Sequence, residues 1–500
     1  MLFNSMSFLL YFPIAVFTYF LIPRRIKYIW LLLASYYFYM SWNPKYMLLI
    51  AFSTIMTWLT GLGINYFKKS DRKHNVLYQK ICLGICCTAN LGMLAYFKYF
   101  RFMLDNLNML LRKLGINIIE RSFDIILPVG ISFYTFQALG YIIDIYREDV
   151  QAERNLFKFA LFVSFFPQLV AGPIERTNRL LKQINNIQNI KLYDYERITN
   201  GLIYMLYGYF LKLVIADRVS LMVDTVFDSW YLYGTVELAA GAIGFAIQIY
   251  CDFSSYSTIA IGAAQVMGFE LMENFDAPYF ASSIKEFWRR WHISLSTWFR
   301  DYLYIPLGGN QCSVVRKYFN LMVTFLASGL WHGANWTYIV WGGIHGIYQI
   351  AGEILKPVRV KIYPHMGIRI DSISYKIGQI IVTFLLTDFA WIFFRAESIG
   401  SAIGYISNIF KRWNPWAIAD KSLYNIGLSN YEWNMLLIAL GVVLIADVIK
   451  RLKNERIDGF LNEQGTLVKG ISIGFMILMI AIFGEYGSGF DARQFIYFQF

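Results

Sequence analysis

The sequence has little charge and little cysteine. Only 16% of its 500 residues are Asp, Glu, Lys or Arg, whereas about a quarter is usual in soluble domains. Its five cysteines form no CxxC pair, which argues against a disulfide framework or a zinc site. It has only five histidines and no HExxH, Walker or dinucleotide-binding motif, which disfavours zinc hydrolases and common nucleotide-binding enzymes. We therefore expect no metal site and no bound cofactor.

Apolar residues are abundant instead, at 57% of the chain, and they gather into long runs. A helix that crosses a bilayer needs about 20 mostly apolar residues. Candidate spans lie near residues 6–22, 28–42, 46–67, 79–97, 125–146, 156–173, 199–215, 237–266, 319–343, 375–394, 434–450 and 467–485. Several of these runs are short, so we predict about eleven true crossings together with interfacial or re-entrant helices. The expected fold class is all-α, in a polytopic integral membrane protein.

Basic residues outnumber acidic ones, 45 to 33, and they collect where apolar runs end. This distribution favours contact with membrane lipids rather than with nucleic acid. The basic loops at Arg24–Lys27 and Lys68–His74 are two predicted spans apart, so we expect both on the cytoplasmic side and the N-terminus outside. The basic loop at Lys98–Asp124 then falls on the outer side, and an amphipathic helix lying in the interface at Phe100–Leu114 would resolve the conflict.

Charged and aromatic residues gather between positions 273 and 311, a stretch that cannot cross lipid as a bare helix. Within it, the pattern from position 282 to 301 predicts one helix that carries Trp288 and His292 on the same face. Arg289 and Arg290 lie beside them. This helix could turn its histidine and arginines toward an anionic ligand, or it could be an interfacial helix anchored by tryptophan.

Two further histidines lie among glycines inside apolar runs. His332 falls in Gly329–Gly333, where glycine allows another backbone or a ligand to come close. Burial keeps a histidine neutral, so His332 could accept a proton from a hydroxyl; the alternative is a core histidine bonded to a neighbouring helix. We interpret His345 mainly as a packing residue. Asp252, in another apolar run, could orient a histidine or pair with an arginine, and pairing is the commoner outcome.

Several motifs together carry a resemblance to a known family. They are Asp252–Ser257, Asn274–Tyr279, Glu286–Leu295, Tyr304–Asn310 and Gly329–Trp336, with further support from Leu127–Gln137, Val170–Ile174, Trp391–Ala396 and Phe495–Phe500. With these motifs the chain closely resembles the membrane-bound O-acyltransferase (MBOAT) family, and its bacterial alginate O-acetyltransferase-like branch most of all. The resemblance extends over nearly the whole chain.

The resemblance implies one membrane-embedded domain over residues 1–500, with its helices around a central funnel. The family core would occupy about residues 125–395, flanked by N-terminal helices in 1–124 and C-terminal helices in 396–500. The family moves an acyl group from a cytoplasmic thioester to a hydroxyl, so the expected co-substrate is acetyl-CoA or an acyl-carrier protein. The essential histidine of the family corresponds to His332, and its second polar position to His292.

The leading hypothesis is O-acetylation of an extracellular or cell-wall polysaccharide at the bacterial cytoplasmic (inner) membrane. Transfer would be direct or would pass through an extracytoplasmic esterase-like or acetyltransferase partner protein. His332 would act as the general base, and His292 or a donor near Asn335 would stabilise the oxyanion. The residues expected to bind substrate or donor are Arg289, Arg290, Trp288, Asn335, Trp331 and Asp252.

Two alternatives stay open. D-alanyl transfer to teichoic acid from a carrier protein would use the same histidine motifs, so these residues do not separate it from acetyl transfer. A polysaccharide or lipid transporter belongs to a different class, and the absence of visible repeat symmetry in the sequence argues against it.

Overall fold

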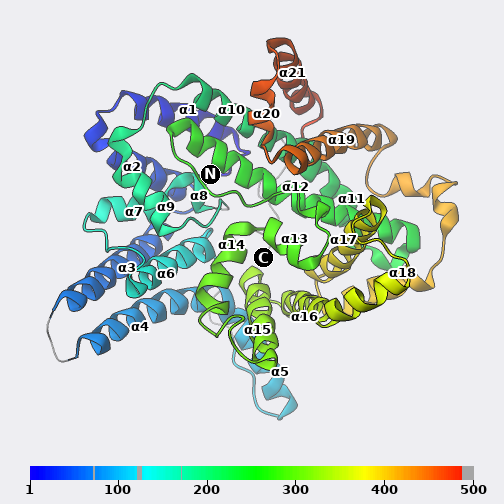
Figure 1. Ribbon diagram of the computed structural model, residues 1–500, viewed down its shortest axis with the longest axis horizontal. Coiled ribbons are helices and arrows are strands. Elements are labelled where there is room, and N and C mark those ends of the chain that lie inside the picture. Colours follow the sequence, from blue (N-terminus) through cyan, green and yellow to red (C-terminus); the bar gives the residue numbers. More distant parts are fainter. Residues whose placement is uncertain (71–73, 121–126, 171, 487–500) are drawn as a thin grey trace. The chain divides into compact units, whose positions relative to one another are not determined.

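Helices alone build the computed structural model across the residues it describes, which are 1–70, 74–120, 127–170 and 172–486 (Figure 1). No β-strand occurs in those ranges, so the all-α prediction is confirmed there. Several sequence predictions include positions outside the described residues. These positions are the motif at Phe495–Phe500, residue 171 in its motif and in the span at 156–173, the start of the span at 125–146, residues 71–73 of one basic loop and residues 121–124 of the other.

Two compact units make up the chain. The first comprises Met1–Gly201 and Ala260–Met272, and the second Leu202–Ile259 and Glu273–Phe500. Every residue that the sequence singled out as catalytic or substrate-binding belongs to the second unit. The single domain expected over residues 1–500 stays a prediction.

The helices of the first unit are mostly short to medium in length. They are α1 (Met6–Leu21), α2 (Lys27–Met40), α3 (Tyr46–Lys69), α4 (Asn75–Leu94), α5 (Phe100–Lys113), α6 (Ile131–Arg147), α7 (Leu156–Ser164), α8 (Phe166–Leu169) and α9 (Thr177–Asn185), with the short turns η1 (Arg24–Ile26), η2 (Ala95–Tyr99) and η3 (Ile187–Asn189).

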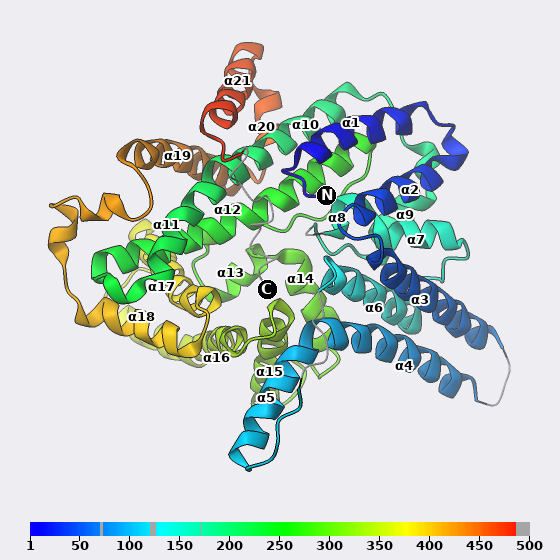
Figure 2. The ribbon, with the colours of Figure 1, turned by 180° about the vertical axis from the view of Figure 1, so that it is seen from behind.

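Small polar residues join α3 to α4, which lie side by side (Figures 1 and 2). Ser53 donates to the side-chain oxygen of Asn90 at 2.5 Å, and the Asn90 amide group donates to Thr57 at 3.3 Å. Ser53 and Thr57 are one turn apart, so they form one face of α3. Small side chains that permit close approach and hydrogen bonds between helices are typical of helix pairs in membranes.

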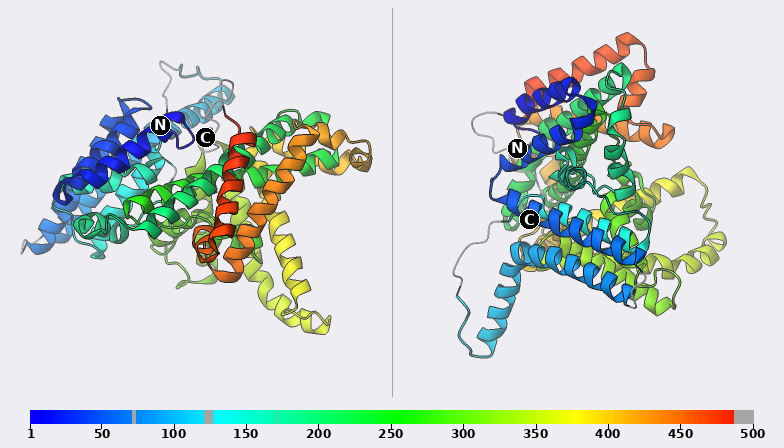
Figure 3. Two further views of the ribbon diagram at one scale, coloured as in Figure 1. Left: turned by 90° about the horizontal axis from the view of Figure 1, so that it is seen from above. Right: turned by 90° about the vertical axis from the view of Figure 1, so that its left-hand side faces the viewer.

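A bend separates α4 from α5, and Figures 2 and 3 show it clearly. The bend coincides with the π-helical turn η2, a common cause of sharp changes in helix direction. The amphipathic helix predicted at Phe100–Leu114 is found as α5 at Phe100–Lys113, with Met103, Leu107 and Leu110 exposed. Its position in a lipid interface stays a prediction.

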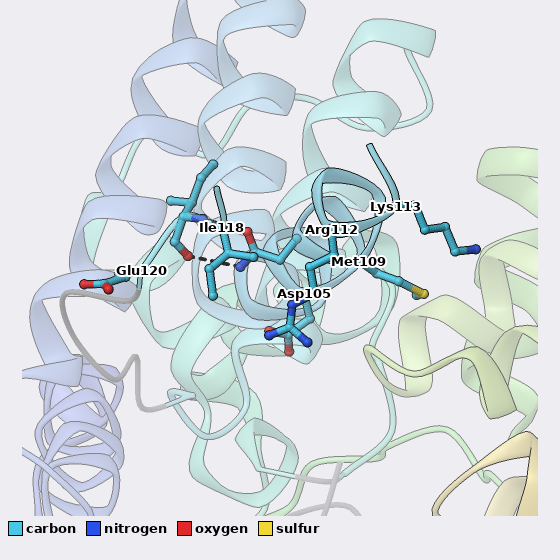
Figure 4. A pocket seen from close by; sticks show the side chains of 8 residues that line it. Asp105, Met109, Arg112, Lys113, Ile118 and Glu120 are labelled. Carbon is cyan, nitrogen blue, oxygen red and sulfur yellow. Dashed lines mark hydrogen bonds between the residues drawn. The ribbon is translucent and has the colours of Figure 1, made fainter. Parts of the chain in front are cut away.

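The segment after α5 turns back along that helix. The Asn108 side chain accepts from the backbone N–H of Ile119 at 2.9 Å and donates to its carbonyl at 3.0 Å. Together α5 and this segment line a pocket of about 710 Å³ (Figure 4), bordered by charged side chains such as Asp105 and Arg112. None of the expected site residues lines it.

The second unit contains the longer helices. Those wholly or mostly within it are α10 (Tyr195–Tyr209), α11 (Asp217–Asp228), α12 (Thr235–Met267), α13 (Ile284–Arg290), α14 (Ile293–Phe299), α15 (Val314–His332), α16 (Trp336–His365), α17 (Ile373–Arg395), α18 (Ile399–Lys411), α19 (Asn430–Lys453), α20 (Ile457–Glu463) and α21 (Thr466–Phe483), with the turns η4 (Phe210–Ala216), η5 (Trp230–Leu232), η6 (Pro278–Phe280), η7 (Arg300–Tyr304), η8 (Pro415–Ile418) and η9 (Ser422–Asn425).

Five helical segments of the described chain are long and apolar enough to cross a membrane. They are Tyr46–Lys69, Asn75–Lys113, Thr235–Met267, Ile373–Arg395 and Thr466–Phe483. All five overlap predicted spans, and the count of about eleven crossings stays a prediction.

The span expected at 319–343 is not one helix. Instead, α15 ends at His332, Gly333 is extended, and α16 begins at Trp336 with the side chain of Asn335 accepting from the backbone N–H of Thr337 at 3.1 Å. Asparagine is a preferred residue at a helix start because its side chain satisfies an N–H that lacks a partner within the helix. The break places His332 at a helix end.

Candidate active site

His292 occupies the break between α13 and α14, with its backbone in the left-handed region (φ 43°, ψ 54°). Asn274 holds this break: its carbonyl accepts from the backbone N–H of Ile293 at 3.0 Å, and its side-chain oxygen from that of Ser294 at 3.2 Å. The Asn274 amide group donates to Ser257 of α12 at 2.9 Å. A residue other than glycine is strained in this conformation, and such strain gathers at functional sites.

The single helix expected from position 282 to 301 is therefore wrong. The first helix ends at Arg290, Trp291 is extended, and a second helix starts at Ile293. Hydrophobic periodicity reports which residues share a face of a helix. It does not report the hydrogen bonds that Asn274 accepts from the turn, because Asn274 lies about twenty positions earlier in the chain. Trp288 and His292 consequently lie on different elements.

The imidazole of His332 lies beside that of His292. The two ring centroids are 6.3 Å apart with their planes at 62°. The Trp331 ring contacts both, at 5.9 Å from His292 and 5.0 Å from His332. His292 is 0% exposed and His332 is 4% exposed. The structure thus joins the two expected catalytic residues and one expected binding residue in one buried cluster.

Aromatic side chains enclose this histidine pair. The Phe253 ring meets His292 edge-on at 4.5 Å, while Trp341 and Phe394 meet His332 at 5.1 Å and 5.3 Å. Such an apolar lining excludes water and strengthens every electrostatic interaction formed inside it.

Burial sets the protonation of His292. Loss of hydration lowers the pKa of its imidazole to about 3, because a charged ring is poorly stabilised in these surroundings. At neutral pH the ring is uncharged, with one nitrogen able to donate a hydrogen bond and the other able to accept one.

Close packing of α15 against α16 positions His332. A Cβ atom added at Gly329 would lie 2.2 Å from the Tyr338 carbonyl oxygen, and one added at Gly342 would lie 2.3 Å from that of Phe325. Only glycine fits at such separations. The glycines that the sequence places around His332 thus serve the contact between two helices.

The two arginines of α13 differ in their surroundings. Arg290 donates to Asp276 at 2.6 Å and to Glu286 at 3.0 Å, and only 14% of its side chain is exposed. Arg289 is exposed and forms no ion pair within the described part of the chain. Ion pairs therefore occupy Arg290, while Arg289 faces outward.

Asp252 pairs with a lysine rather than with a histidine. Lys212, in η4, lies 2.6 Å from Asp252 and 2.7 Å from Asp217, and all three side chains are almost fully buried. Phe253, the next residue of α12, is the one that contacts His292. The sequence left Asp252 either to orient a histidine or to pair with an arginine, and in the structure it forms an ion pair with a lysine.

Trp288 and Asn335 both make structural hydrogen bonds. The Trp288 indole N–H donates to Nδ1 of His345 at 3.2 Å. Asn335 caps α16 and donates to the carbonyl of Glu397 at 3.1 Å. Neither contact reaches the ring of His292 or of His332.

Sequence reasoning missed the roles of Asn274, Lys212 and Trp341. Asn274 was part of a quoted motif, but the backbone it caps follows some twenty positions later. Lys212 and Asp252 are forty positions apart, and only the fold joins them. The one local signal was the rarity of a lysine inside an apolar run, which marks a buried partner or a function. Elsewhere in the described chain, no three His, Cys, Asp or Glu side chains converge as metal ligands would.

The chain is similar to known proteins over most of its length. A model of the membrane-bound O-acyltransferase family matches residues 150–387, a range that includes both histidines. The chain is 38% identical to the probable alginate O-acetylase AlgI of Pseudomonas aeruginosa over 435 residues, which is 85% of this chain and 78% of that protein.

The names of two other relatives specify different acceptors. The chain is 34% identical to the peptidoglycan O-acetyltransferase of Helicobacter pylori over 433 residues, 81% of this chain and 78% of that protein. It is 32% identical to the teichoic acid D-alanyltransferase of Streptococcus thermophilus over 240 residues, 45% of this chain and 56% of that protein.

Proposed function

Because the chain belongs to the membrane-bound O-acyltransferase family and is an O-acyltransferase, we propose that it moves acetyl groups from a cytoplasmic thioester to hydroxyls of an extracellular or cell-wall polysaccharide. The buried pair His292 and His332 carries this proposal, because it supplies two imidazoles to one reaction centre. Similarity to O-acetylating relatives extends over 81–85% of the chain, against 45% for the D-alanyl relative. That difference favours acetyl over D-alanyl transfer.

His332 takes the proton of the acceptor hydroxyl in this proposal. The hydroxyl oxygen then bonds to the thioester carbonyl carbon, and the carbonyl oxygen becomes an oxyanion. As the C–S bond breaks, the imidazolium of His332 returns the proton to the leaving thiolate. General base catalysis of this kind contributes typically 10²–10⁴-fold in rate.

His292 would stabilise the oxyanion. A neutral ring with a low pKa keeps its N–H at the pH of the cell and can donate it to developing negative charge. The strained, doubly anchored backbone at His292 supports this role, because a fixed donor needs no rearrangement during the reaction.

We propose different roles for the remaining residues that were expected to bind substrate or donor. Arg289, exposed on α13, would contact the phosphates of the donor. Arg290 would keep α13 in place through its carboxylate partners, and Trp331 would pack against both imidazoles. Asp252 and Asn335 would act indirectly, by holding α12 and the start of α16.

The chain is a multi-pass membrane protein. We propose that it has about eleven crossings around a central funnel in the bacterial inner membrane, with its N-terminus outside. Donor and acceptor would then reach the histidines from opposite sides. The donor would be acetyl-CoA or a carrier protein, and transfer would be direct or would pass through an esterase-like or acetyltransferase partner outside.

The test is the ester content of the cell-surface polymer, measured by NMR in a deletion strain. Wild-type protein should restore acetyl esters, and His332→Ala should not. His365→Ala is the matched control, because His365 is an exposed histidine at the end of α16. All variants are compared at equal membrane levels.

Two results would count against the proposal. Acetyl content that does not change on deletion rejects acetyl transfer, and ester-linked D-alanine on teichoic acid is then measured in the same strains. Full restoration of acetyl esters by His332→Ala rejects the catalytic assignment.

A further inference from the structure

His345 has a fixed tautomer. The indole N–H of Trp288 donates to its Nδ1 at 3.2 Å, and an indole nitrogen can only donate. Nδ1 therefore carries no proton, so the neutral imidazole has its proton on Nε2. The ring is 0% exposed and stacks on Phe287, with centroids 6.3 Å apart and planes at 5°. The N–H on Nε2 thus has a defined position.

That Nε2 atom is buried and has no hydrogen-bond partner within the residues that the structure describes. Nearly all buried polar groups of proteins are paired, so a buried donor of this kind calls for an acceptor from outside the chain. The packing role that the sequence suggested for His345 explains why its ring is buried. It does not explain why a buried N–H lacks an acceptor.

One tryptophan separates His345 from His332. The Trp341 ring is 5.2 Å from His345 and 5.1 Å from His332, and it is fully buried. Trp288 contacts the same tryptophan at 5.7 Å. Trp341 thus contacts both His345 and the histidine of the proposed reaction centre.

We infer that the Nε2–H of His345 binds an amide carbonyl on the pantetheine arm of the thioester donor. Acetyl-CoA and acyl-carrier proteins both carry this arm, and its amide carbonyls are the hydrogen-bond acceptors that follow the thioester. This inference rests on the proposed function. It makes His345 a donor-binding residue, held by Trp288 in the tautomer that the amide requires.

Two substitutions distinguish the roles of the two ring nitrogens of His345. In His345→Asn the side-chain oxygen replaces Nδ1 as acceptor for Trp288, but no group reaches the position of Nε2. In His345→Gln the longer side chain brings an amide N–H close to that position. We expect the asparagine variant to lose the donor contact and the glutamine variant to keep most of it.

The experiment compares two acetyl donors in membrane vesicles that contain the full chain and its polymer acceptor. S-acetylpantetheine carries the amide groups, and ethyl thioacetate carries none. The measured quantity is the ratio of kcat/KM for the two donors, which does not depend on how much protein is folded. His345→Asn should reduce this ratio about tenfold, as loss of one hydrogen bond predicts, whereas His345→Gln should keep it within about threefold of the wild-type ratio.

Other outcomes overturn the inference in distinguishable ways. An unchanged ratio in His345→Asn means that Nε2–H binds ordered water or only packs, and it leaves the proposed function intact. Equal losses in both variants mean that the ring shape matters and the N–H does not. Absence of acetyl transfer from either thioester by the wild-type protein rejects the proposed donor chemistry and the inference with it.

Discussion

Arg289 and Arg290 are neighbours that should respond differently to the same substitution. Arg289→Ala removes an exposed guanidinium, so KM for the thioester donor should rise about tenfold with no change in melting temperature. Arg290→Ala removes partners from Asp276 and Glu286 and should cost about 1–3 kcal/mol of stability. Donor titrations and thermal unfolding of the purified variants measure both effects. A melting temperature that falls equally in the two variants would contradict the assigned roles.

The buried ring of His292 should make stability depend on pH. The pKa of His292 is lowered from 6.5 to about 3 in the folded protein. Below pH 6.5 this imidazole therefore binds a proton in the unfolded chain but stays neutral in the folded protein. Stability is therefore complete above pH 6.5 and is lost as pH falls toward 3, by about 1.4 kcal/mol per pH unit.

His292→Asn tests this dependence, because asparagine does not titrate and tolerates left-handed backbone. Between about pH 7 and about pH 5 its melting temperature should fall less than that of the wild-type protein. The exposed His365 provides the control, and His365→Asn should follow the wild-type curve. If the melting temperature falls equally with pH in all three proteins, the pKa of His292 in the folded protein is not lowered.

At the scale of elements, the contact between α15 and α16 decides where His332 lies. Gly329→Ala places a methyl group against the Tyr338 carbonyl, so the helices must separate, at a cost of about 1–3 kcal/mol. We expect a lower melting temperature. We also expect kcat to fall by a larger factor than the factor by which KM changes, because His332 moves with α15.

Gly352→Ala is the matched control on α16, since nothing lies within 4 Å of the added atom. Alanine in a helix interior should there raise stability by about 0.5–1 kcal/mol. Thermal unfolding and donor kinetics of both variants provide the comparison. Normal stability and activity in Gly329→Ala would mean that the helix contact is not required.

At the scale of the whole molecule, the number of crossings depends on helices such as α2. Its 14 residues extend roughly 21 Å, less than the hydrocarbon core of about 30 Å. If α2 and α3 both cross, Arg25 and Lys69 lie on the cytoplasmic side and Lys45 lies outside. Each of the three side chains is exposed.

Single cysteines at these positions, in a background without the native cysteines, test the arrangement with a thiol reagent that does not cross membranes. Lys45→Cys should react in intact cells, whereas Arg25→Cys and Lys69→Cys should react only after the membrane is opened. Equal reactivity of Arg25→Cys and Lys45→Cys in intact cells would exclude α2 as a crossing and reduce the count.

The sequence by itself determined the membrane class, the helical fold, the amphipathic α5 and the family, because composition, periodicity and motifs are local properties. The same motifs singled out His292 and His332 as the expected catalytic residues, and that role stays a prediction. Five described segments long enough to cross a membrane all fell on expected spans.

Only the tertiary structure decided how those residues are arranged. Asn274 breaks a helix that periodicity makes continuous, Lys212 rather than an arginine pairs with Asp252, and Trp288 fixes the tautomer of His345. Each of these contacts joins residues about 20 to 57 positions apart. Hydrogen bonds at such separations depend on which helices pack together, and no local pattern in the chain records that packing.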